Sequence, residues 1–132
     1  FQNRFAYKTI FLQCMTSLEL DAVTYSSSIH VAHVIGKPSE PSRYNSPNHH
    51  SIWGVIGRDG GFPTMNVPAG FTAHVFDRDA DGNLVGPVPA KLPVSITFAG
   101  THFGEPTLIK IASAYEAATK HRAPPPDFGP LP

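Results

Sequence analysis

Residues 60–71, with the sequence GGFPTMNVPAGF, restrict the fold more than any other part of this chain. Pro63 and Pro68 each lack a backbone N–H and have a fixed φ, so neither fits inside a helix without breaking it. Residues 64–67, which lie between them, form a short run typical of a strand. Gly70 follows at a position where we expect the chain to turn. The sequence therefore predicts a short internal strand bracketed by the two prolines.

Two other segments have the periodicity of helices. Residues 1–20 contain no Gly or Pro, and their apolar side chains recur at helical spacing, which predicts one face formed by Phe5, Phe11, Leu12, Met15 and Leu18. Cys14 lies within this segment and is expected to be a small buried apolar residue. Pro106 suits the first turn of a second helix. The face predicted for that helix contains Leu108, Ile111, Ala112, Tyr115 and Thr119.

Short β-branched and apolar runs predict further strands at residues 20–25, 74–76, 84–85 and 94–98. An Asp-Gly turn at 81–82 is expected between the middle two. Helix, strand, loop, strands and helix together indicate the α/β class. Several strands are apolar on both faces and need a covering layer above and below. Two helices supply only part of that cover, so we expect this chain to be a C-terminal piece of a longer polypeptide.

The charge balance argues against two classes of partner. The chain has 132 residues, with ten basic and ten acidic side chains and no run of either sign, so we expect neither nucleic acid nor an anionic membrane as partner. No apolar run is long enough for a transmembrane helix. The single cysteine fits a reducing compartment, and we expect a cytoplasmic protein.

Two patterns suggest metal sites without completing one. Asp77, Asp79 and Asp81 have the spacing of a calcium loop, but Val88 occupies the twelfth position, where a carboxylate is needed. The run is better explained as the polar tip of a hairpin. The histidine pairs have no further ligand at suitable spacing: His30 with His33, and His49 with His50. We therefore predict no metal ion and no other cofactor.

The sequence contains no convincing nucleophile of its own. Ser26, Ser27 and Ser28 lack a flanking glycine turn that could supply an oxyanion site, so we interpret them as the end of a strand. Trp53 is the only tryptophan. It is interpreted either as core or as the wall of an apolar pocket, with Asn48 and His50 nearby.

The order of several short blocks resembles the C-terminal part of amidase signature enzymes. The resemblance covers nearly the whole chain and depends on the blocks occurring together at this spacing. They are residues 20–23 (LDAV), 61–71 (GFPTMNVPAGF), 92–100 (LPVSITFAG), 103–108 (FGEPTL), 111–112 (IA), 115–116 (YE) and 121–124 (HRAP).

The resemblance implies a fold and a reaction. Residues 1–132 would form the C-terminal segment of one amidase domain, with residues 123–132 as a Pro-rich tail. They would supply the last strands of a mixed β-sheet sandwiched between helices. Enzymes of this family cleave amides through a serine acyl-enzyme, using a second serine and a lysine as proton relays. That Ser-Ser-Lys triad would lie upstream, because the glycine-serine-rich motif is absent from this sequence.

The resemblance therefore assigns no catalytic residue to this chain. It implies that the chain alone is inactive, that its partner is the upstream catalytic part and that the substrate is a small amide. Candidate substrate-binding residues follow from their position before and within the Gly-Phe-Pro strand: Asn48, His50, Trp53 and Phe62. The alternative is a free-standing, non-catalytic binding or interaction module derived from an amidase fold.

Overall fold

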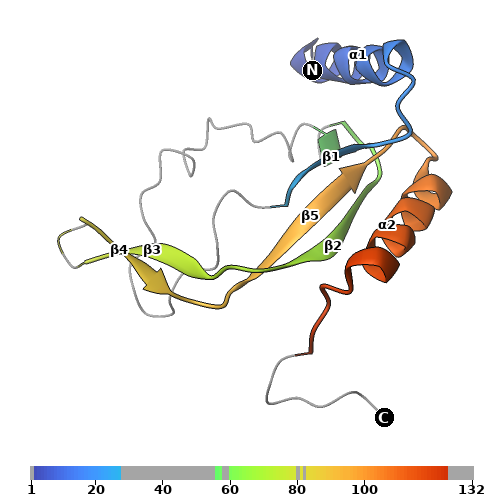
Figure 1. Ribbon diagram of the computed structural model, residues 1–132. Helices are drawn as coiled ribbons and strands as arrows, with labels where there is room; N and C mark the ends of the chain where they lie inside the picture. The colour runs from blue at the N-terminus through green and yellow to red at the C-terminus, as the bar shows by residue number, and fades with distance from the viewer. Residues whose placement is uncertain (1, 28–55, 58–59, 80, 82, 125–132) are drawn as a thin grey trace.

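The computed structural model describes residues 2–27, 56–57, 60–79, 81 and 83–124 (Figure 1). Their elements, in chain order, are α1 (Gln2–Ser17), β1 (Val23–Ser26), β2 (Thr64–Phe71), β3 (His74–Arg78), β4 (Leu84–Pro89), β5 (Pro93–Ala99) and α2 (Glu105–Thr119). Helices combined with antiparallel sheets are compatible with the predicted α/β class. Most of the predicted long loop, both histidine pairs and most of the Pro-rich tail lie outside the described residues.

β5 is the central strand of a three-stranded sheet with the order β1-β5-β2, and it pairs antiparallel with both neighbours. Thr97 on β5 lies opposite both Tyr25 and Asn66. Residues directly opposite each other share a face of the sheet. The registers therefore give one face with Met65, Val67, Ile96 and Phe98, and a second, the Thr97 face, with Tyr25, Asn66, Thr97 and Ala99.

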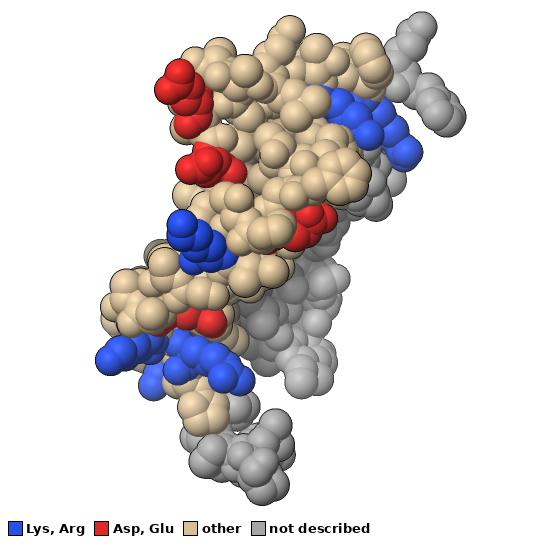
Figure 2. All heavy atoms as spheres, turned by 90° about the vertical axis from the view of Figure 1, so that its right-hand side faces the viewer, with Lys and Arg blue, Asp and Glu red and all other residues tan. Residues whose placement is uncertain are grey.

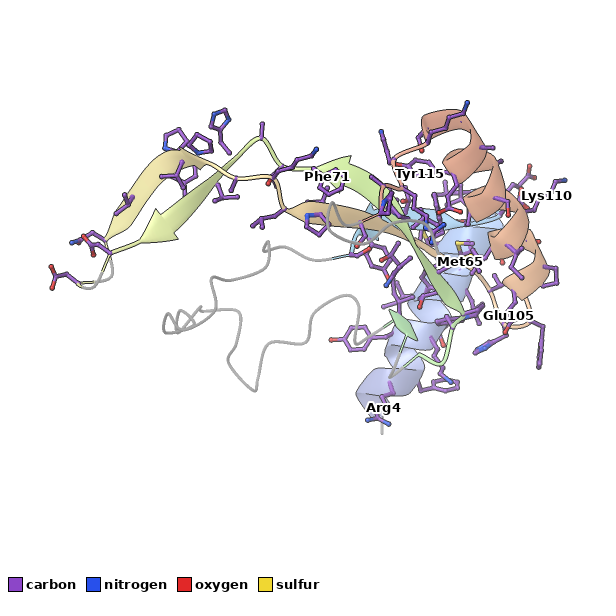
Figure 3. The ribbon with its side chains drawn as sticks, turned by 90° about the horizontal axis from the view of Figure 1, so that it is seen from below. Arg4, Met65, Phe71, Glu105, Lys110 and Tyr115 are labelled. Carbon is purple, nitrogen blue, oxygen red and sulfur yellow. The ribbon has the colours of Figure 1, made fainter. Side chains whose placement is uncertain are left out.

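α2 covers the first of these faces. Leu108 and Ala112 are buried against Val67 and Phe98, and Met65 and Tyr115 lie at the margin of the cluster (Figure 3). The Phe98 and Tyr115 rings meet edge to face at 5.7 Å between centroids, which is a favourable aromatic geometry. The predicted packing face of this helix is confirmed for Leu108, Ile111, Ala112 and Tyr115, whereas Thr119 lies outside the cluster and its hydroxyl donates to the Tyr115 carbonyl.

α1 lies against the other face, at the end of the sheet near Ala99, and its predicted packing is only partly confirmed. Met15 is buried, and Phe11 packs against a cluster of Ile56, Phe62 and Ala99. The prediction was wrong for the other members of the expected face, since Leu18 is 62% exposed and Phe5 and Leu12 are also exposed. The helix ends at Ser17, before Leu18.

Cys14 is exposed rather than buried, which corrects a second expectation about α1. It lies one residue before Met15, and successive residues of a helix point about 100° apart. Met15 is on the buried side of α1, so the neighbouring Cys14 side chain points to a different, exposed side.

β2 is longer than predicted. The strand continues through Pro68, which lies opposite Ser95, to Phe71, which lies opposite Pro93. The pairing shifts between Pro68 and Gly70, where Gly70 has a φ of 110°. Such a φ is available to glycine without strain, so the chain forms a bulge at this point instead of ending the strand.

β3 and β4 form a separate two-stranded sheet. At its tip the Asp79 carboxylate accepts hydrogen bonds from the backbone N–H groups of Asp81 and Asn83, at 3.0 and 2.9 Å, and from the Asn83 side chain. This arrangement is the polar hairpin tip that the sequence predicts. Bonds of this kind from Asp to the backbone are typical of turns.

The surface over α2 carries acidic and basic side chains, and neither sign covers it alone (Figure 2). Among the described residues, no helix combines the length and apolar character needed to cross a membrane.

Replacing Glu19 by glycine is expected to stabilise the end of α1. Glu19 has a φ of 50°, and the N–H groups of Glu19 and Leu20 bond the carbonyls of Thr16 and Met15. In this type of helix end the left-handed residue is usually glycine, because a Cβ is unfavourable there. Glu19→Gly should raise the free energy of unfolding by about 0.5–1 kcal/mol in a urea titration.

The matched control is Gln13→Gly, at an exposed position inside the same helix. It should lower the free energy of unfolding by about 1 kcal/mol. A loss of stability in both variants would contradict this account of residue 19.

Candidate functional site

A row of polar side chains crosses the Thr97 face from β1 to β2. Thr97 Oγ1 lies 2.7 Å from Ser27 Oγ and 2.6 Å from Asn66 Oδ1. A hydroxyl carries one proton and an amide oxygen only accepts, so Thr97 donates to Asn66 and accepts from Ser27. Thr97 is only 3% exposed. The three side chains fix the relative positions of three segments that are far apart in the sequence.

The Phe62 cluster lies next to this row on the same face. Ala99 is two residues beyond Thr97 on β5 and belongs to the cluster of Ile56, Phe62 and Ala99, with Val23 and Tyr25 packed against it. Burial raises the pKa of the Tyr25 phenol above its ordinary value of 10.0. A polar row therefore borders an apolar, partly desolvated region.

Phe62 is the one predicted binding residue among those described. It is 4% exposed, and its ring lies 4.5 Å from the Phe11 ring and 4.5 Å from the His102 ring, between centroids. The structure thus places it in a core cluster, and its contact with substrate stays a prediction. The other three candidates, Asn48, His50 and Trp53, lie outside the described residues.

The two ends of the segment that holds those three candidates are nevertheless described. Ser27, at one end, bonds Thr97, and its N–H donates to the Ser95 carbonyl at 3.1 Å. Ile56, at the other end, is buried in the Phe62 cluster. The chain therefore leaves and rejoins the described structure on the Thr97 face.

His102 was not anticipated from the sequence. Its side chain is exposed, and its ring stacks on Phe62 at an interplanar angle of 30°. Its neighbour Gly61 brings the backbone close, since a Cβ there would lie 4.0 Å from the His102 ring. His102 lies three residues after the end of β5, but no sequence pattern pairs it with Phe62, because the contact depends on how β2 and β5 are paired.

The described geometry bears on two kinds of chemistry considered from the sequence, a serine nucleophile and a metal site. Ser27 donates to a threonine hydroxyl, which is not a base at neutral pH, so this contact does not activate it as a nucleophile. Within the described part of the chain, no three potential ligands among His, Cys, Asp and Glu lie close enough to hold a metal ion.

A protein of Arabidopsis thaliana named as a probable amidase is 42% identical to this chain over 66 residues. Those residues are 50% of this chain and 10% of that protein, so the match spans about a tenth of the curated relative. No family model matches the chain, and no solved structure gives a significant match. The comparison supports a relation to amidases over half of the chain.

Removing the central hydroxyl of the polar row is expected to destabilise the fold. Thr97→Val leaves Ser27 and Asn66 without their shared partner, and we expect the free energy of unfolding to fall by about 1–2 kcal/mol. Combining it with Asn66→Ala should cost less than the sum of the two single changes, because both remove the same bond. Thr24→Val, at an exposed position on β1, is the control and should have little effect. If the losses of stability in the two single variants add up in the double variant, the proposed bond between Thr97 and Asn66 is contradicted.

Tyr25 should make stability fall at alkaline pH. Its pKa is raised in the folded state, so above about pH 10 the unfolded chain loses the phenol proton first. The contribution of this group is complete below pH 10 and is lost as pH rises through the folded pKa. Tyr25→Phe should flatten the loss of stability with rising pH, measured by urea unfolding at several alkaline pH values. An unchanged slope in Tyr25→Phe would contradict this assignment.

Proposed function

We propose that this chain is the C-terminal segment of an amidase that hydrolyses carbon–nitrogen amide bonds, with its catalytic residues on upstream polypeptide. The observation that carries the proposal is the 42% identity over 66 residues to a protein named as a probable amidase. The order of the sequence blocks at 61–71, 92–100 and 103–108 points to the same family.

The surface of α1 supports the idea that more polypeptide packs here. Several of its large apolar side chains, and two just after it, are exposed on different sides: Phe5, Tyr7, Ile10, Leu12, Leu18 and Leu20. Large apolar side chains that stay exposed on more than one side of a helix are suited to packing against further polypeptide.

The edges of the sheet support it as well. In the described structure β1 and β2 are the outer strands, and each is paired on one side only. Outer strands present backbone N–H and C=O groups that can pair with a further strand. In the proposed enzyme, upstream strands extend the sheet at these edges.

The proposed reaction divides the work between the two parts of the enzyme. On the upstream part, a serine oxygen attacks the amide carbonyl, a lysine and a second serine move its proton to the leaving amine, and water then hydrolyses the acyl-enzyme. Backbone N–H groups of the glycine-serine-rich loop stabilise the oxyanion. In this proposal the present chain contributes substrate-binding residues, namely Asn48, His50, Trp53 and Phe62, of which Phe62 belongs to the cluster on the Thr97 face.

A probe that reacts with activated serines tests the location of the nucleophile. A fluorophosphonate should label the longer polypeptide at a serine outside residues 1–132 and should leave this chain alone unlabelled. Simple amides should be hydrolysed only when the upstream part is present, whether covalently joined or added in trans. Labelling of the isolated chain, or a 14.2 kDa native protein that melts cooperatively without a partner, would favour the non-catalytic binding module instead.

Two variants of the active enzyme distinguish a structural role of Phe62 from a role in substrate binding. Phe62→Leu and Phe98→Leu each replace a buried aromatic ring by a smaller aliphatic side chain, one on the Thr97 face and one beneath α2. Both should lower the free energy of unfolding by roughly 1–3 kcal/mol. If Phe62 lines the pocket, only Phe62→Leu should change KM, by about tenfold for an apolar amide. Equal KM values in both variants would assign Phe62 to the core alone.

A further inference from the structure

The β3–β4 hairpin forms an arm that extends away from the three-stranded sheet (Figures 1 and 3). We define the arm as residues 74–89, from the start of β3 to the end of β4. Its base is held firmly. The Thr72 N–H bonds the Leu92 carbonyl at 2.9 Å, and the Thr72 hydroxyl donates to the Ala90 carbonyl at 2.6 Å and accepts from the Leu92 N–H. The arm is therefore a fixed projection joined to the central sheet at a bonded neck.

The arm exposes large apolar side chains on both of its strands. Phe76 on β3 is 64% exposed and Val85 on β4 is 43% exposed. A two-stranded ribbon is only marginally stable in water and gains from a third strand or a packed layer. The exposed ring of Phe76 lies in the middle of β3, so a partner covering it would lie along that strand.

Its two edges differ in their capacity to pair. β4 contains Pro87 and Pro89, which have no N–H to donate, whereas β3 contains no proline. Proline on an outer strand blocks the addition of another strand. In the described structure β3 pairs only with β4, so its outer edge is the one suited to a further strand.

The charges at the two ends of the arm are opposite. Asp79 and Asp81 lie exposed at the tip, and Lys91 lies at the base with its Nζ 5.1 Å from the centre of the Phe71 ring. Consider two β3 strands paired antiparallel about Phe76. In such a pair, a residue that follows Phe76 lies opposite the residue that precedes Phe76 by the same number of positions. Asp81 is therefore matched with Phe71. β3 itself runs only from His74 to Arg78, and continuing its register past both ends brings Asp81 of one copy toward Phe71 of the other, beside Lys91.

We propose that a second copy of this chain pairs with the first through β3, antiparallel and centred on Phe76. The two arms then form a four-stranded sheet with β3 strands at its centre and the proline-bearing β4 strands outside. Phe76 of each copy meets its equivalent, and Asp81 of each approaches Lys91 of the other. The contact is self-complementary, as required for a two-fold dimer. It does not depend on the amidase proposal, because the arm lies apart from the Thr97 face.

A cross-link at the centre tests the register. Cys14 is the only cysteine, so Phe76→Cys in a Cys14→Ser chain leaves one thiol at the proposed two-fold axis. Directly opposite residues of antiparallel strands have Cα atoms about 4.5–5.5 Å apart, within the range that a disulfide spans. Mild oxidation should give mostly covalent dimer. Val85→Cys, exposed on the outer strand of the same arm, is the control and should remain mostly monomer. Equal cross-linking of both variants would overturn the proposal.

A charge exchange tests the contact between tip and base. Asp81→Lys and Lys91→Asp should each weaken the dimer, raising its dissociation constant by about tenfold over the two equivalent contacts, and the double variant should restore it. Sedimentation velocity at low and high salt measures this, and salt should weaken the unmodified dimer. A monomer at all concentrations, or a double variant no tighter than the single ones, would overturn the proposal. Binding of the arm to a separate upstream chain in place of a second copy would also overturn it.

Discussion

The pairing of β5 on both sides is the constraint on which the rest of the described structure depends. This strand carries Phe98 toward α2 and Ala99 toward α1, so successive residues belong to different clusters. Ala99 is fully buried, and the next residue, Gly100, has the Leu108 side chain 3.3 Å from where its Cβ would lie. Small residues at the end of the strand allow one helix to approach on each side.

The two faces of the three-stranded sheet differ in the polarity of their buried side chains. On the α2 face the buried residues are apolar and packed by a helix that follows β5 after a short turn. On the Thr97 face an apolar cluster lies beside hydrogen-bonded polar side chains. A surface that combines apolar cover with a few fixed polar groups is typical of ligand sites, whereas a uniformly apolar face is typical of core packing. This difference is the physical reason for placing the proposed pocket wall on the Thr97 face.

The sequence located the elements well where proline and glycine mark them, as at the start of α2 and the tip of the hairpin. It misplaced the end of β2 because Pro68 can remain in a strand when a bulge follows it. Periodicity grouped Leu18 with Met15 without showing which side of the helix would be covered. Thr97 and His102 could not be found in advance. Thr97 bonds Asn66, which is 31 positions away in the sequence, and Ser27, which is 70 positions away. Such contacts depend on strand pairing.

The arm and the Thr97 face belong to two different sheets, which allows them to have different roles. β2 and β5 remain paired up to Phe71 and Pro93, and the bonds of Thr72 to Ala90 and Leu92 close the sheet before the arm begins. Extra residues placed beyond such a neck leave the register of the central strands unchanged. A partner strand added to β3 would therefore lengthen a different sheet from the one that holds the polar row. Assembly through the arm would then leave the geometry around Phe62 and Thr97 unaltered, whatever chemistry is carried out beside it.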